Sequence, residues 1–330
     1  MTAIPEGKGY WRPIDGNNGQ KIVLVVVVTL GEITGIGPEV VLKAIAKFPP
    51  QEVKIIGARV LLTKLREKLK IAIDFEPYLL DFLPGIDFTF GKPDRKTAQF
   101  AWEGLKVGVS LIKKGEAKGI VTAPISKSNL YRIGFPYPGQ TEFFAQEFGV
   151  RNYCFLAYHK KIKIAFLTLH CPLKEVPSRI KTRWVVEKGL LLYDFLHRLE
   201  GIESPRIGLF SLNPHGGEFS RGEEKEMAKG IKRLKDLGID IVGTLPADSF
   251  LFYYKRYDGF ISPYHDQGMI MVKTIGKGKG INTTLGLPFI RTSPLHGTAF
   301  DIAGKGVADS RGMEEAIRLC RKWAKEMVSG

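Results

Sequence analysis

Three of the six histidines in this 330-residue chain share one local setting, in which turn-forming residues follow a run typical of a strand. The carboxyl ends of parallel strands line the ligand crevice of an open α/β sheet, so side chains placed there converge on one point. Three imidazoles that leave coordination positions open are typical of a catalytic divalent-metal site. One such histidine alone is more often structural, and the shared placement is what favours a metal site at His170, His215 and His265.

Two aspartates are candidates for supporting roles near such a site. Asp266 directly follows His265, and Asp248 ends the segment Leu245-Pro-Ala-Asp248. A carboxylate beside a metal site orients a ligand imidazole or acts as a general base. Either aspartate is equally suited to capping a helix.

Polar residues suited to an anionic substrate lie on both sides of these histidines. Lys273, Asn282 and Arg291 fall in one polar stretch, with Lys127 and Thr141 upstream. Together they could clamp a phosphate and a carboxylate through charge-assisted hydrogen bonds. Each of them alone is also consistent with an ordinary surface residue.

A glycine-rich segment runs from position 296 to position 306. Small residues let the backbone approach a ligand closely, and a lone carboxylate there accepts hydrogen bonds from both ribose hydroxyls of an adenine dinucleotide while repelling a 2′-phosphate. An ordinary loop before the last helix fits the spacing equally well. The candidate cofactor-binding residues are His296, Gly297, Thr298, Ala299 and Asp301.

The elements that must position these residues alternate between strand and helix, which indicates an α/β fold. Continuous β-branched runs predict buried strands, and apolar residues at helical spacing predict the helices between them. A tight polar turn at 159–161 predicts an antiparallel hairpin, so the sheet is expected to be mixed. The predicted strands are 21–30, 51–57, 119–124, 153–158, 162–170, 206–212, 257–263 and 272–275, and the predicted helices are 38–48, 60–70, 97–114, 179–199, 222–237 and 313–327.

The composition excludes several classes of protein. With 44% apolar and 25% charged residues the chain resembles globular proteins, and its longest apolar run, at 22–30, is too short for a bilayer helix. The segment 1–20 carries no leader pattern, so we expect a flexible arm there and a cytoplasmic protein. Three widely separated cysteines, Cys154, Cys171 and Cys320, favour neither a disulfide framework nor a zinc–thiolate site.

The formal net charge of +15 suggests nucleic-acid binding as one possibility, because basic surfaces release counterions from phosphates. Lysines and arginines are spread along the chain with acids among them, however, as on solvated helix faces. Asn and Gln are scarce beside abundant Lys and Glu, which is typical of heat-adapted proteins. We therefore expect neither a nucleic-acid nor a membrane partner, and the charge would help attract a small phosphorylated substrate.

Five motifs occur in order along the chain. They are Gly35-Ile-Gly-Pro-Glu39, Asn213-Pro-His-Gly-Gly-Glu218, Leu245-Pro-Ala-Asp248, Tyr264-His-Asp-Gln-Gly268 and Asn282-Thr-Thr-Leu-Gly-Leu-Pro-Phe-Ile-Arg-Thr292. In this order they resemble the 4-hydroxythreonine-4-phosphate dehydrogenase family of the pyridoxal phosphate pathway. The resemblance places that family's metal ligands on the three selected histidines and its acidic neighbours on Asp248 and Asp266. Its substrate-binding residues fall on Thr141, Lys273, Asn282 and Arg291, with Lys273 also among the catalytic residues.

The resemblance implies the two-lobed, three-layer α/β/α fold of isocitrate and isopropylmalate dehydrogenases, with a mixed sheet. One lobe, 21–125 with 275–330, would carry the cofactor, and the other, 126–274, the metal site and dimer contacts. The stretch 296–307 is similar to the adenosine-binding loop of isopropylmalate dehydrogenases, which implies that Asp301 holds the ribose and favours NAD over NADP. The resemblance also implies one divalent cation (Zn, Mg, Co or Mn) and a homodimer with a shared active site.

Two positions depart from the family pattern. Gln140 stands where the family has a histidine that touches the substrate phosphate, and Leu295 stands where an aspartate usually precedes His296. Gln140 is still expected to bind substrate, because its amide donates hydrogen bonds, but it carries no positive charge.

The expected reaction is a metal-assisted, NAD-dependent oxidation of 4-phosphooxy-L-threonine to a β-keto acid, which loses carbon dioxide to give 3-amino-2-oxopropyl phosphate. The nearer alternative, motivated by Gln140, is a paralogue that acts on phosphorylated threonate or erythronate. The remote alternative is an anion- or nucleic-acid-binding protein without catalysis, against which the missing basic-aromatic patches argue.

Overall fold

The computed structural model describes residues 26–83 and 85–329, which form two compact units. Residues 149–287 are the middle unit, and the described residues up to 148 form the flanking unit together with 288–329. The boundaries predicted at 125/126 and 274/275 fall earlier in the chain, because helices that follow residue 125 pack in the flanking unit and a strand that follows residue 274 pairs in the middle unit. The arm predicted at 1–20 lies outside the described residues.

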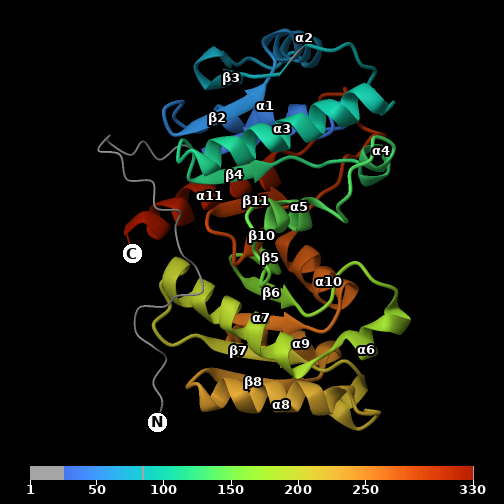
Figure 1. Cartoon of the computed structure of the whole chain (residues 1–330), viewed down its shortest axis with the longest axis vertical. Coiled ribbons are helices and arrows are strands. Elements are labelled where there is room, and N and C mark those ends of the chain that lie inside the picture. Colours follow the sequence, from blue (N-terminus) through green and yellow to red (C-terminus); the bar gives the residue numbers. More distant parts are fainter. Residues whose placement is uncertain (1–25, 84, 330) are drawn as a thin grey trace. The chain divides into compact units, whose positions relative to one another are not determined.

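The flanking unit is a parallel sheet with helices on both faces (Figure 1). Successive strand residues point to opposite faces, and in the fourth strand Gly119 lies against Cys320 whereas Ile120 lies against Gly108. The strand order is β3-β2-β1-β4-β11. The elements are β1 (Val26–Thr29), α1 (Gly37–Ile45), β2 (Val53–Gly57), α2 (Arg59–Leu69), β3 (Leu79–Asp81), α3 (Arg95–Lys113), β4 (Gly119–Thr122), α4 (Lys127–Tyr131), α5 (Gln140–Glu147), β11 (Ile290–Pro294) and α11 (Arg311–Ser329).

The middle unit has a mixed sheet, also covered on both faces. Its strand order is β10-β5-β6-β9-β7-β8, in which β5 pairs antiparallel with both neighbours and the strands from β6 to β8 are parallel. Phe166 lies against Gly268 on one face, and Gly259 lies against Leu192 on the other. The elements are β5 (Cys154–His159), β6 (Ile162–Phe166), α6 (Val176–Arg179), α7 (Thr182–Asp194), β7 (Arg206–Phe210), α8 (Glu223–Asp236), β8 (Asp240–Leu245), α9 (Phe250–Tyr253), β9 (Gly259–Ser262), α10 (His265–Gly276) and β10 (Ile281–Leu285).

The predicted α/β class and mixed sheet are confirmed, as is the antiparallel hairpin, which is formed by β5 and β6. The strand predicted at 272–275 is wrong, because these residues lie in α10. Gly268, Met269, Val272 and Gly276 are buried at spacings of a helical face, and the apolar run was too short to show that period. Strands β3, β8, β10 and β11 were not predicted, and β10 and β11 carry Asn282 and Arg291.

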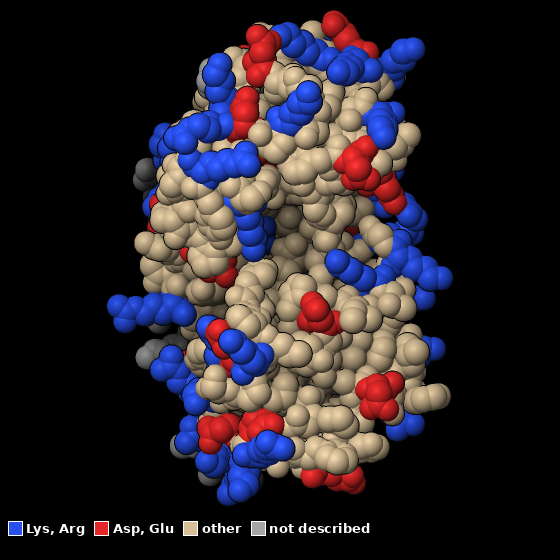
Figure 2. Space-filling view, turned by 90° about the vertical axis from the view of Figure 1, so that its right-hand side faces the viewer, with Lys and Arg blue, Asp and Glu red and all other residues tan. Residues whose placement is uncertain are grey.

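Charges of both signs are interspersed on the face seen in Figure 2, where Asp and Glu stand among Lys and Arg. This distribution agrees with solvated helix faces and differs from the continuous basic stripe that nucleic-acid binding favours. Within residues 26–83 and 85–329, none of the helices is both long and apolar enough to cross a membrane.

Two glycine substitutions in helices should change stability in opposite directions. A Cβ at Gly230 of α8 would lie 2.5 Å from Cβ of Val185, whereas at Gly104 of α3 the nearest atom would be 3.7 Å away. Gly230→Ala is expected to lower the free energy of unfolding by about 1–3 kcal/mol through overpacking. Gly104→Ala should raise it by up to about 1 kcal/mol through helix propensity. Urea unfolding of both variants measures this, and equal effects would contradict the close α7–α8 contact.

Candidate active site

The three predicted metal histidines follow three adjacent parallel strands of the middle unit. Strand β9 pairs in parallel with β6 on one side and with β7 on the other, so the carboxyl ends of all three strands share one edge. His170 comes after β6, His215 after β7, and His265 directly after the turn that ends β9. The sequence analysis predicted this edge for the three histidines, because the carboxyl ends of parallel strands share one edge of a sheet.

His170 and His265 lie together in a cavity of about 430 Å³. The centroids of their rings are 5.9 Å apart. Imidazole nitrogens bind divalent zinc at about 2.1 Å, so two rings that share one ion have centroids no more than about 6.5 Å apart. The separation of the two rings is therefore within the range that one shared cation requires. The cavity is lined by Leu169, His170, Cys171, Pro172, Leu173, Val176, Tyr264, His265 and Asp266.

The His265 ring is oriented by its own neighbour. Nδ1 of His265 lies 2.6 Å from Oδ1 of Asp266, which leaves Nε2 as the nitrogen available to a ligand. A carboxylate that fixes the tautomer and direction of a ligating imidazole is a recurring feature of metal sites. Asp266 thus contacts the ring that the sequence analysis expected it to orient, and its own side chain is largely exposed.

The rest of the Tyr264–Gly268 motif fixes the position of this turn. The hydroxyl of Ser262 donates to Oε1 of Gln267, and Nε2 of Gln267 donates to the carbonyl of Ser211 at 2.9 Å, which ties the end of β9 to the end of β7. Gly268 permits close packing on β6, since a Cβ there would lie 2.6 Å from the ring of Phe166.

His215 does not join the other two histidines. It lies in the 3₁₀ turn Pro214–Gly217 with a left-handed φ of 57°, and its ring neighbours Phe219. The turn is anchored by the hydroxyl of Thr244, which donates to the carbonyl of Gly216 at 2.7 Å, and by hydrogen bonds from Asn213 to Glu224. Among the described residues, no group of three His, Cys, Asp or Glu side chains is close enough to hold a metal ion.

A buried guanidinium forms a second polar cluster, in the flanking unit. Arg291 of β11 is 4% exposed, and its Nη2 donates to Oγ1 of Thr122 at 2.7 Å and to Oε1 of Gln140 at 3.0 Å. Desolvation lowers the pKa of Arg291 to about 10, so the group stays charged near neutral pH. Nε2 of Gln140 donates to the carbonyl of Ala123. Gln140 therefore links the guanidinium of Arg291 to the backbone that follows β4.

The side chains of Lys127 and Glu142 both lie close to Gly139 in the same unit. A Cβ at Gly139 would lie 3.1 Å from Oε2 of Glu142 and 3.5 Å from Nζ of Lys127. Burial lowers the pKa of Lys127, and the carboxylate of Glu142 partly opposes that shift. Thr141 precedes Glu142 in the first turn of α5, and it is buried. Two cations thus lie near the start of α5, Lys127 beside Gly139 and Arg291 hydrogen-bonded to Gln140.

Three further predicted residues, Asp248, Lys273 and Asn282, are also absent from the lining of the histidine cavity. Asp248 is exposed in the turn Ala247–Ser249, where Ser249 donates to it. Lys273 is exposed on α10, about 12 Å along the helix axis from His265 at 1.5 Å per residue. Asn282 is buried on β10 opposite Ala157.

The candidate cofactor loop rests on the start of α1. The amide of Ile36 donates to the carbonyl of Thr298 at 2.9 Å, and a Cβ at Gly35 would lie 2.6 Å from that same oxygen. Ala299 has a left-handed φ of 42°, and Gly297 has open space where a Cβ would lie. The loop therefore has a defined conformation with a backbone that a ligand can approach.

Two side chains of this loop fit a dinucleotide. Asp301 is exposed, as a ribose ligand must be. Nε2 of His296 is buried and has no hydrogen-bond partner among the described residues, while its Nδ1 lies 3.1 Å from the carbonyl of Gly297. Burial lowers the pKa of His296, which favours the neutral ring. An orphaned nitrogen of this kind is a polar group that a bound ligand would satisfy.

Sequence reasoning missed two residues of these clusters. Thr122 ends β4 and accepts from Arg291, and the strand-end rule used for the histidines would have found it. Cys171 lines the histidine cavity, and only its position next to His170 signalled this.

A model of the family described as pyridoxal phosphate biosynthetic protein PdxA matches residues 33–320. The chain belongs to the PdxA family. It is a PdxA-family dehydrogenase and thus an oxidoreductase, as the five motifs indicated.

Relatives of the PdxA family match over nearly their whole length. A 4-hydroxythreonine-4-phosphate dehydrogenase of Sulfurihydrogenibium sp. strain YO3AOP1 is 34% identical over 89% of this chain and 96% of its own. A protein of Oceanobacillus iheyensis whose provisional name is D-threonate 4-phosphate dehydrogenase is 33% identical, with the same coverage. The crystal structure of the 4-hydroxythreonine-4-phosphate dehydrogenase of Klebsiella pneumoniae is 29% identical and covers 91% of this chain and 99% of its own, with a TM-score of 0.78.

Removing the hydroxyl that binds Arg291 should be costly. Thr122→Val takes away the acceptor of Nε and Nη2 of a buried charge, and is expected to lower the free energy of unfolding by about 2–3 kcal/mol. Thr283→Val is the matched control, because Oγ1 of Thr283 is buried on β10 without a partner in the described part of the chain, so its loss should be neutral or stabilising. Urea unfolding compares the two, and equal losses would contradict the role of Thr122.

Proposed function

We propose that this protein catalyses the NAD-dependent, divalent-metal-assisted oxidation of 4-phosphooxy-L-threonine, with loss of carbon dioxide to give 3-amino-2-oxopropyl phosphate. The observation that carries the proposal is the pair His170 and His265, held at a metal-sharing distance in one cavity with His265 oriented by Asp266. Relatives bearing the name of this activity support the choice of substrate.

The residues of this chain have distinct roles in that reaction. His170 and His265 would hold the cation, and the loop with His296 and Asp301 would hold the dinucleotide. When bound, the cation polarises the substrate hydroxyl and the carbonyl formed from it, and NAD accepts the hydride. Arg291, kept charged by its buried partners, would bind an anionic group of the substrate.

Lys127 would supply the positive charge that Gln140 lacks. Its ammonium lies next to Gly139, at the start of the helix that carries Gln140 and Thr141. A phosphate bound there would therefore meet two cations, Lys127 and Arg291, without a protonated histidine. We propose Lys273 and Asn282 as further substrate ligands on the resemblance alone.

A second copy of the chain would complete the metal site. One copy gathers two imidazoles, while His215 is exposed in a firmly anchored turn away from them. A homodimer with shared sites, in which His215 of one subunit joins His170 and His265 of the other, would supply three imidazoles to each cation.

The second candidate substrate is phosphorylated D-threonate. The relative with that provisional name is about as similar as those named for 4-phosphooxy-L-threonine, and the chain departs from the family pattern at Gln140. Only 4-phosphooxy-L-threonine carries an amine, so a comparison of kcat/KM for the two substrates shows whether the site recognises that group.

NADH formation with 4-phosphooxy-L-threonine should require a divalent cation. We expect turnover of the metal-loaded protein to fall at least about a hundredfold after chelation and to return on adding zinc, cobalt, magnesium or manganese. Absorbance at 340 nm measures NADH with each substrate. Full activity after chelation would remove the metal role, and a higher kcat/KM with D-threonate phosphate would reverse the substrate assignment.

Complementation between two inactive variants tests the shared site. His170→Ala and His215→Ala should each abolish activity, whereas co-expression of the two should restore about a quarter of it, because random pairing makes half of the dimers mixed and each mixed dimer has one intact site. Co-expression of His170→Ala with His265→Ala is the matched control and should restore nothing. If the first mixture also stays inactive, each site is built from one chain.

A further inference from the structure

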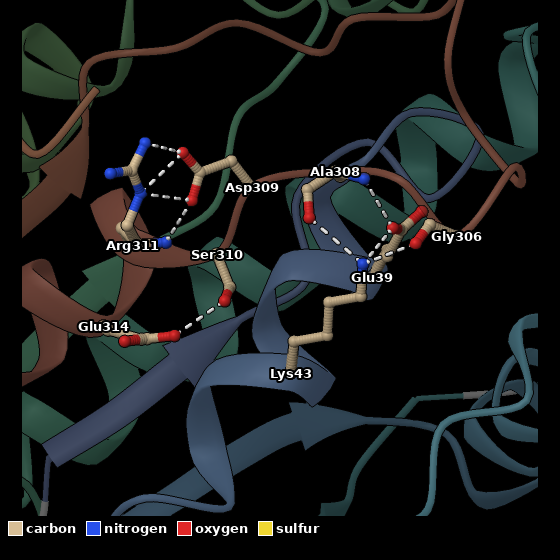
Figure 3. A network of polar contacts seen from close by, with 8 residues as sticks. All are labelled: Glu39, Lys43, Gly306, Ala308, Asp309, Ser310, Arg311 and Glu314. Carbon is tan, nitrogen blue, oxygen red and sulfur yellow. Dashed lines mark hydrogen bonds and ion pairs between the residues drawn. The ribbon is translucent and has the colours of Figure 1, made fainter. Parts of the chain in front are cut away.

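A buried ion pair holds the segment that follows the candidate cofactor loop (Figure 3). Glu39 of α1 is 1% exposed, and its Oε1 accepts from Nζ of Lys43 at 2.6 Å and from the amide of Ala308 at 2.8 Å. Nζ of Lys43 also donates to the carbonyls of Gly306 and Ala308, at 2.8 and 3.1 Å. Glu39 and Lys43, one helical turn apart, therefore bind both an amide and two carbonyl groups of the backbone at 306–308.

The other end of the loop rests on the same helix start. Ile36 donates to Thr298, and Gly35 allows the chains to approach there. The loop thus has two anchors on α1, one at Thr298 and one at 306–308, and Asp301 lies between them in the chain. In the described structure no helix or strand spans 295–310, so these contacts replace the ladder that would otherwise hold the backbone.

A role in packing alone does not explain the pair. A buried carboxylate is costly unless it is paired and hydrogen-bonded, and apolar residues of similar size often stabilise a core as well or better. Oε2 of Glu39 is buried without a partner among the described residues, so the pair is not optimised for stability. The pair instead fixes the conformation of the loop backbone, because each of its hydrogen bonds is made either to that backbone or between Glu39 and Lys43.

We propose that Glu39 and Lys43 are positioning residues for dinucleotide binding, which set the loop in its binding conformation before the cofactor arrives. The inference rests on the proposed function, in which the loop binds NAD. When the loop is ordered before the cofactor arrives, binding does not bear the entropic cost of ordering it. Loss of the pair should therefore weaken NAD binding and leave the chemical step unchanged. The kinetic signature is a raised KM for NAD at constant kcat.

The test uses the full-length protein with its metal. We expect Glu39→Gln and Lys43→Met each to raise the Kd for NADH, followed by NADH fluorescence, and the KM for NAD by roughly tenfold, with kcat within about twofold of wild type. Hydrogen exchange at the backbone amide of Ala308, which donates to Glu39, should become faster in both variants. The double variant Glu39→Gln/Lys43→Met leaves no unpaired buried charge, and it carries the test if a single variant does not fold.

Two controls separate positioning from stability. Lys47→Met removes an ion pair to Glu314 just beyond the end of α1 and should leave NADH binding unchanged. Val109→Ala creates a small cavity in α3 and lowers stability away from the loop.

The possible outcomes are distinct. Wild-type affinity for NADH in the variants, with faster exchange at Ala308, would overturn the inference, as would an equal loss of affinity in Val109→Ala. If the wild-type protein itself binds no NADH, the proposed function fails and this inference fails with it. The inference is supported if the KM for NAD rises in the Glu39 and Lys43 variants and in neither control variant.

Discussion

Three adjacent parallel strands that end at one edge impose the main constraint on this molecule. Since β6, β9 and β7 run in the same direction, the turns that follow them emerge together, and residues far apart in sequence become neighbours. The turn after β9 starts a helix with His265 as its first residue, and Asp266 then aims the imidazole. The pairing of His170 with His265, and the direction of the His265 ring, follow from strand direction together with one short hydrogen bond.

The flanking unit meets a different physical demand, which is to keep a positive charge inside a folded core. Burial works against the charged form of Arg291, and Thr122 and Gln140 offset this by accepting its hydrogen bonds. Gln140 is well suited to this role, since its side-chain oxygen accepts from Arg291 while its nitrogen donates to the carbonyl of Ala123.

Strand-helix alternation and strand-end placement could be predicted from the sequence because they depend on local period and on a general rule of sheet topology. Residues 272–275 were assigned to a strand because a short apolar run does not distinguish the two periods. The separation of His215 from His170 depends on the left-handed turn at 215–217, which is a matter of backbone conformation. The Glu39–Lys43 anchor joins residues more than 260 positions apart, and no pattern in one sequence reports such a contact.

The Gly35–Glu39 motif shows how a glycine-rich turn can serve a ligand without touching it. Gly35 and Gly37 are required by close approach, since a Cβ at either would lie within 2.6 Å of a backbone oxygen, and Pro38 occupies the first turn of α1. The amide of Ile36, which a phosphate loop would offer to an anion, is already used by Thr298. Gly35, Ile36 and Glu39 thus contact the segment 296–308, whereas Gly37 approaches the carbonyl of Leu30. The motif therefore acts as a base for that segment instead of as a phosphate cradle.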